Sequence, residues 1–135
     1  METVGHGTSS SSPVAAIEQL RSGFAGMLID PAHADYEHAR GVWNGMITRR
    51  PALIARCTGV ADVQAALAYA RADGLPVAVR GGGHSAAGLA CPEGGVVIDL
   101  KPMNQVEVDP QARIARAGGG ATLAQFDAAT QAHGL

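Results

Sequence analysis

The chain has 135 residues, of which 47% are hydrophobic and 16% are charged, with a formal net charge of −2 and a pI near 6.2. This balance predicts one folded domain rather than a disordered chain, and the ten scattered Lys and Arg residues argue against a nucleic-acid partner. No apolar run reaches the roughly 18 residues of a membrane span, and no signal-like segment opens the chain. We therefore expect a cytoplasmic protein with no membrane partner.

The first 47 residues carry weak structural signals. Residues 1–13 are small and polar, with a run of serines, and predict a disordered tail. Residues 14–47 predict an N-terminal helical and irregular segment, with a second short helix over residues 35–43. His33 and His38 are five residues apart, which places them on different faces of a helix and argues against a metal site.

Residues 48–135 carry stronger signals and are expected to form the main domain. A helix over residues 60–73 is predicted because Thr58 suits its N-cap and Gly74 stands just past its end. Short apolar runs bounded by turn residues predict three strands, over residues 53–56, 75–80 and 96–98.

The last part of this domain is predicted to be a hairpin followed by a helix. Two alternating runs between residues 105 and 117 are joined by turn residues, which is typical of a hairpin. Thr122 and Gln125 form a capping-box pattern, and Leu123 and Phe126 are expected on the buried face of the helix. The order of elements predicts an α+β domain with a small mixed sheet and flanking helices.

A glycine-rich loop directly follows the second predicted strand. Its residues are Arg80, Gly81, Gly82, Gly83, His84 and Ser85. Consecutive glycines let the backbone take positive φ and approach a ligand closely, and successive N–H groups in such a loop can hold an anion such as a pyrophosphate. His84 is expected at the rim of that anion site.

The loop has two other interpretations. Gly81, Gly83 and Ala86 match the G-x-G-x-x-A spacing of a Rossmann fold, but glycines and a proline between residues 88 and 95 exclude the helix that must follow. A glycine-rich surface turn with an incidental histidine is the alternative if the loop is considered by itself. Neither a metal site nor a nucleophilic triad at His84 is indicated, because partner residues at the required spacing are absent.

Four stretches of this sequence, in this order, resemble one known family. They are VWNGMITRRPALIARC, RGGGHSAAG, GGVVIDLKPMN and ATQAHGL, which together run from about Trp43 to Leu135. The family is that of the FAD-linked oxidases with a PCMH or vanillyl-alcohol-oxidase type of FAD-binding domain, and within it the berberine-bridge-enzyme-like group. The co-linear order is more specific than the loop alone.

This resemblance implies FAD as the cofactor, held through its pyrophosphate by Arg80 to Ser85. It also implies covalent attachment of the flavin through His84. In the complete enzyme, a small-molecule substrate would reduce the flavin and dioxygen would reoxidise it.

The chain is expected to be the N-terminal portion of a longer enzyme. Family members are several times longer, and their substrate-binding and catalytic residues come from parts beyond Leu135, so no catalytic residue can be named. The alternative is a truncated, non-catalytic remnant that does not bind FAD on its own, because an incomplete sheet leaves edges and apolar faces exposed.

Strand alternation makes a further prediction about the loop. Val77 and Val79 are expected to face the core, which leaves Ala78 and Arg80 on the other side of the strand. We therefore expect Gly82→Val to weaken FAD binding more than Arg80→Ala does.

Three further features have modest interpretations. A second glycine-rich stretch, Gly118 to Thr122, could bind an anion at a helix N-terminus, but close packing of a strand end on a helix is favoured because Thr122 caps that helix. Cys57 is expected in the core, and Cys91 is expected to be an ordinary small loop residue. Neither resembles the second flavin-attachment cysteine of the berberine-bridge group.

Overall fold

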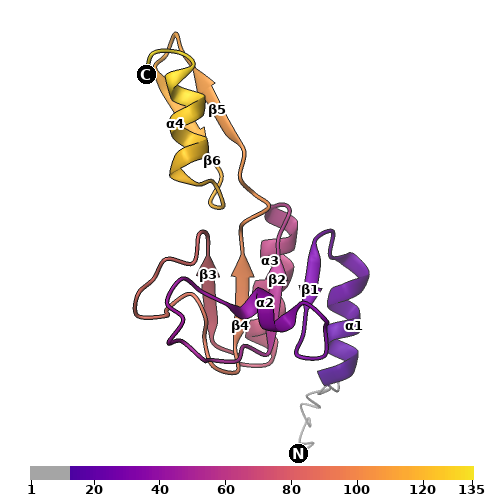
Figure 1. Cartoon of the computed structure of the whole chain (residues 1–135). Helices are drawn as coiled ribbons and strands as arrows, with labels where there is room; N and C mark the ends of the chain where they lie inside the picture. The colour runs from indigo at the N-terminus through magenta and orange to yellow at the C-terminus, as the bar shows by residue number, and fades with distance from the viewer. Residues whose placement is uncertain (1–12) are drawn as a thin grey trace, which may run out of the picture.

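The computed structural model describes residues 13–135 (Figure 1). The tail expected over residues 1–13 lies outside the described residues, apart from Pro13, with which the first helix begins. The elements in chain order are α1 (Pro13–Gly23), β1 (Met27–Ile29), α2 (Tyr36–Arg40), β2 (Leu53–Arg56), α3 (Val60–Ala72), β3 (Val77–Arg80), β4 (Val96–Asp99), β5 (Val106–Asp109), β6 (Ile114–Ala117) and α4 (Leu123–Gln131). None of the helices in the described part has the length and apolar character that a membrane crossing needs.

The centre of the fold is a four-stranded mixed sheet with the strand order β1-β2-β4-β3. Strands β2, β4 and β3 are parallel, and β1 is antiparallel to β2. Helix α3 connects β2 to β3, as a crossover between parallel strands requires. The α+β fold with a small mixed sheet is therefore confirmed.

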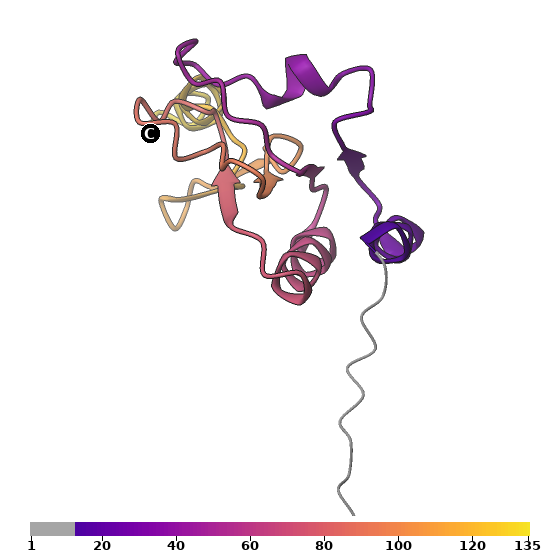
Figure 2. The ribbon, with the colours of Figure 1, turned by 90° about the horizontal axis from the view of Figure 1, so that it is seen from below.

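The sheet separates two apolar layers, which Figure 2 shows end-on, with α1 and α3 on one side and the α2 region on the other. On the first side, Leu53 and Val96 pack with Leu20 of α1 and Ala70 of α3. On the second side, Ile54 and Val97 pack with Ile29, Tyr36 and Ala39. Alternate residues of β2 and β4 thus face opposite layers, so both strands are apolar throughout.

The N-terminal half contains one strand that the sequence did not predict. Strand β1 pairs with β2, and Gly26 beside it lies so close to the Arg56 carbonyl oxygen that a Cβ would not fit. The segment expected over residues 14–47 and the main domain expected over residues 48–135 therefore share one sheet. The boundary between them stays a prediction.

The hairpin and α4 lie beyond the carboxyl ends of the parallel strands (Figure 1). The expected capping box is present, because Thr122 Oγ1 accepts from Gln125 N and Gln125 Oε1 accepts from Thr122 N. The expected buried face is wrong for Leu123, which is 81% exposed, and Phe126 is only half-buried. Helix α4 contacts β5 but buries no residue completely.

The expected orientation of β3 is also wrong. Val77 and Val79 are exposed, the latter to 60%, whereas Ala78 and Arg80 are buried. The reason is that β3 is the edge strand, and α3 packs on β2 and β4 instead. The opposite face of β3 is covered, and there Arg80 reaches a buried carboxylate on β4.

A buried carboxylate organises the start of α3. Asp62 accepts hydrogen bonds from Thr58 N, Thr58 Oγ1 and Ala25 N, each 2.8 Å long. Thr58 therefore serves Asp62 rather than acting as the predicted N-cap, which is Gly59. Burial raises the pKa of Asp62, but the hydrogen bonds from Thr58 and residues 25 and 26 lower it by more, so the pKa lies below its usual value.

We predict that Asp62 makes folding stability depend on acid pH. Because its pKa is lower in the folded state, its contribution is complete above about pH 4, the unfolded value, and is lost as the pH falls through the folded value. Asp62→Asn should lower the free energy of unfolding at pH 7 by about 1–3 kcal/mol and flatten its fall in acid.

Urea unfolding at several pH values measures both effects. Asp73→Asn is the matched control, because Asp73 is exposed at the end of the same helix. Equal pH slopes for Asp62→Asn and the wild type would contradict the assignment.

Candidate functional site

The three glycines after β3 occupy different environments. Gly83 is buried with φ = +74°, which favours glycine. A Cβ on Gly81 would lie 2.7 Å from the carbonyl oxygen of Gly119, so this position needs glycine for close approach. Gly82 is exposed, and a Cβ there would meet only the His84 ring, at 3.6 Å. The backbone therefore requires glycine at positions 81 and 83 and tolerates a side chain at position 82.

The N–H groups of this loop are unpaired. Within residues 13–135, no hydrogen bond uses the backbone N–H of any residue from 81 to 85. The loop is closed just afterwards, where Gly88 N donates to Ser85 O at 3.0 Å and Leu89 N donates to Ser85 Oγ at 3.2 Å. Only Gly83 of these residues is buried, so the other donors are open to solvent or to a ligand. Successive N–H groups of this kind can hold an anion from outside the chain.

His84 and Gly82 line one open cleft of about 870 Å³, together with the start of α4. The His84 side chain is exposed and has no hydrogen-bond partner within the described part of the chain. The remaining lining residues are Lys101, Asn104, Gly120, Ala121, Thr122, Leu123, Ala124 and Gln125. The cleft thus lies between the two glycine-rich stretches, residues 80–85 and 118–122, which the sequence alone did not place together.

The second glycine-rich stretch, Gly118 to Thr122, packs closely against the preceding chain, as the sequence predicts. Gly118 lies against the Met103 carbonyl and Gly120 against the Leu100 carbonyl, with no space for a Cβ at either. Thr122 caps α4. The contact between Gly119 and Gly81 places this packed stretch beside the first loop, which sequence reasoning missed.

Lys101 is a cleft residue that the sequence analysis also missed. It is the only lysine in the chain and follows shortly after β4. Its side chain is exposed and takes part in no ion pair within residues 13–135. A position just past the carboxyl end of a parallel strand was the available signal, because such ends commonly face ligands.

Arg80 does not reach the cleft. Its side chain is 1% exposed, and Nη2 donates to Asp99 Oδ2 at 2.8 Å. Arg56 Nε approaches the same oxygen at 3.5 Å from the other neighbouring strand. Nε and Nη1 of Arg80 are buried without a partner in the described part of the chain. Arg80 therefore does not line the cleft, and its effect on the loop comes from anchoring the end of β3 to Asp99 in the interior.

Both cysteines are buried free thiols. Burial, with the nearby carboxylates of Asp62 and Asp99, raises the pKa of Cys57 to about 12. Burial also raises the pKa of Cys91, although the guanidinium groups of Arg80, Arg40 and Arg49 oppose the shift. Neither thiol lines the cleft, so the core assignment of Cys57 is confirmed and Cys91 is more deeply buried than a loop residue was expected to be.

Comparison with known proteins gives consistent matches. The family model described as an FAD binding domain matches residues 51–135. The (R)-6-hydroxynicotine oxidase of Paenarthrobacter nicotinovorans is 40% identical over 95 residues, which make up 70% of this chain and 21% of that protein. The chain thus spans about a fifth of the length of this curated relative.

Solved structures agree. The 6-hydroxy-D-nicotine oxidase from Arthrobacter nicotinovorans has a TM-score of 0.80 and 35% identity, over 82% of this chain and 24% of that chain. The BBE-like 1 protein of Physcomitrella patens has a TM-score of 0.67 and 28% identity, over 74% of this chain and 22% of that one. With the glycine loop at the end of β3, these matches show that the chain belongs to the FAD-linked oxidases with a PCMH-type FAD-binding domain, of which it forms a partial, N-terminal portion.

Proposed function

We propose that this chain is the FAD-binding portion of a flavin-dependent oxidase and that the cofactor lies in the cleft between residues 81–85 and α4. The observation that carries the proposal is the run of five unpaired N–H groups in a loop of which Gly82 and His84 line that cleft. The backbone would donate to pyrophosphate oxygens, which needs no loop side chains. Lys101 would add positive charge on the opposite wall, and the first turn of α4 would add its free N–H groups.

We further propose that His84 attaches the cofactor covalently. His84 is exposed and lines the cleft, and its imidazole has no hydrogen-bond partner within the described residues, so a ring nitrogen is free to react. The attachment would form one C–N bond in place of a C–H bond of a flavin methyl group and the imidazole N–H bond. The two protons and two electrons that this releases would be taken up by dioxygen, giving hydrogen peroxide.

The bound flavin would supply hydride acceptance from a small-molecule alcohol or C–H substrate. The part of this chain in that reaction is to bind and orient the cofactor. We assign no general base among its residues. The proposal includes dioxygen as the acceptor of electrons from the reduced flavin.

The role of His84 predicts acid-stable flavin. After expression with FAD, the acid-precipitated wild type should remain yellow, and His84→Ala should lose essentially all of the bound flavin absorbance. His38→Ala is the matched control, because His38 is exposed on α2 and does not line the cleft. A His84→Ala pellet as yellow as the wild-type pellet would contradict attachment at this residue.

FAD binding itself predicts a higher thermal midpoint, because a ligand that binds only the folded state stabilises it, by about 2.7 kcal/mol at 100 times Kd. Trp43, the only tryptophan, is held beside the loop because its backbone N–H donates to Gly83 O at 3.0 Å, so its fluorescence should be quenched as FAD binds. The exposed apolar residues Val79 and Leu123 favour the alternative, a remnant that does not bind FAD. Unchanged midpoint and fluorescence at millimolar FAD would establish that alternative.

The sequence predicts that Gly82→Val weakens FAD binding more than Arg80→Ala does. Because Arg80 is buried, these two variants cannot be compared by FAD binding alone. Arg80→Ala deprives buried Asp99 of its closest cationic partner, and breaking a buried pair destabilises by about 3–5 kcal/mol. Its effect on FAD binding would therefore be masked by unfolding.

The informative pair is Gly83→Ala with Gly82→Ala. Gly83→Ala forces a Cβ onto a left-handed residue and should lower the free energy of unfolding by about 1–2 kcal/mol, together with FAD affinity. Gly82→Ala should unfold like the wild type, because its Cβ meets open space and the His84 ring. Urea unfolding and Trp43 fluorescence titration measure the two effects, and equal destabilisation by both changes would refute this account of the loop.

A further inference from the structure

The polypeptide over residues 42–47, which we call the 42–47 segment, runs along the His84 loop and bonds to it on both sides of His84. Trp43 N donates to the carbonyl oxygen of Gly83 at 3.0 Å. Asn44 Nδ2 donates to the carbonyl oxygen of Ala86 at 2.8 Å. Two consecutive residues of one segment therefore hold the residue before His84 and the residue two positions after it.

The 42–47 segment also packs against the loop at two places. The Cα of Val42 lies 3.9 Å from the position that a Cβ on Gly83 would occupy. Ile47 fills the space beside Gly88, where a Cβ would be 2.7 Å from Ile47 Cδ1. The 42–47 segment thus contacts the loop at Gly83 and leaves no room for a side chain at Gly88.

Asn44 is fixed in one orientation by its own segment. Its Oδ1 accepts from Met46 N at 3.1 Å, and its backbone oxygen accepts from Ile47 N at 3.0 Å. With the amide oxygen occupied, the amide nitrogen is the group that faces Ala86 O. A carboxylate in this place could still accept from Met46 N, but it would have no proton for Ala86.

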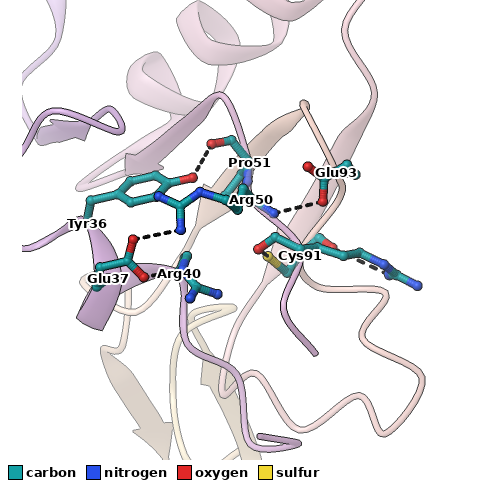
Figure 3. Close-up of polar contacts among 8 residues, drawn as sticks. Tyr36, Glu37, Arg40, Arg50, Pro51, Cys91 and Glu93 are labelled. Atoms are coloured by element: carbon teal, nitrogen blue, oxygen red, sulfur yellow. Dashed lines mark hydrogen bonds and ion pairs between the residues drawn. The ribbon is translucent and has the colours of Figure 1, made fainter. Parts of the chain in front are cut away.

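The two flanks of the 42–47 segment are anchored by the polar network in Figure 3. Glu37 on α2 bonds Arg40 Nε and Arg50 Nη1, each at 2.7 Å, so it joins the residues on either side of the segment. Tyr36 donates its hydroxyl to Pro51 O at 2.6 Å, and the Arg50 guanidinium lies 5.0 Å from the centre of its ring. The segment is therefore held from outside the loop.

We propose that Asn44 is a positioning residue, which holds the His84 loop in the conformation that presents His84 and the unpaired N–H groups to the cleft. It lies outside residues 51–135, the stretch that the FAD-binding family model matches. The consequence for cofactor binding rests on the proposed function, whereas the effect on the loop does not.

The test replaces Asn44 by Asp, which keeps its size and the acceptor but removes the donor. In the FAD-free chain, hydrogen exchange of the Gly88 and Leu89 amides should become roughly tenfold faster, while strands β2 and β4 keep their wild-type rates. The imidazole NMR signals of His84 should shift or broaden, and those of His38 should not. Gln64→Glu makes the same chemical change at an exposed position of α3 and should alter none of these.

Asn44→Ala is the second variant, and it should reproduce the loop effects without a negative charge. Unchanged exchange of the loop in both variants would overturn the proposal, and so would equal acceleration in β2 and β4, which would make Asn44 a general stability residue. If the wild type takes up FAD, acid-stable flavin should fall at least tenfold in Asn44→Asp. If the wild type takes up none, the proposed function fails, while faster loop exchange still supports the positioning role.

Discussion

The ion pair between Arg80 and Asp99 fixes the point from which the glycine loop departs. Asp99 is completely buried on β4, in register with Arg56 on one neighbouring strand and Arg80 on the other. A carboxylate in that place is stable only if cations pair with it, and both neighbouring strands supply one. The pair therefore ties the carboxyl ends of three parallel strands together, and the loop starts at the residue after Arg80.

The base of the loop is therefore constrained by packing and by backbone conformation. Gly81 lies against Gly119 and Gly83 takes a left-handed conformation, so a side chain is disfavoured at both positions. The 42–47 segment satisfies loop carbonyls, at Gly83 and Ala86, but none of the N–H groups from 81 to 85. Two carbonyls of the loop are thus paired inside the protein while its N–H groups remain available, and this is the pattern that the proposed binding of an anion needs.

Much of this architecture follows from local sequence. The apolar runs of β2 and β4 and the capping box of α4 depend on residues within one element, and each was predicted nearly to its bounds. The side of β3 that faces the core depends on how the neighbouring elements cover this edge strand. The apolar residues Val77 and Val79 suggested the wrong side. Burial of Arg80 was missed because its partner lies 19 residues away. Propensity and periodicity carry no information about such distant partners.

The candidate site also combines a part that local sequence predicts with a part that depends on distant residues. Sequence pattern identified the loop and His84, because consecutive glycines are informative wherever they occur. The cleft has a second wall, made by Lys101 and the start of α4. This wall is far from the loop in sequence, and β4, the hairpin and the Gly118–Gly120 turn bring it to the cleft. Each of those glycines allows an approach to a backbone carbonyl or side chain of residues 100–103, so the second wall is placed by close packing of main chain against main chain. Any Cβ added at these glycines would push the second wall away from residues 100–103, so the glycines set where that wall of the cleft lies.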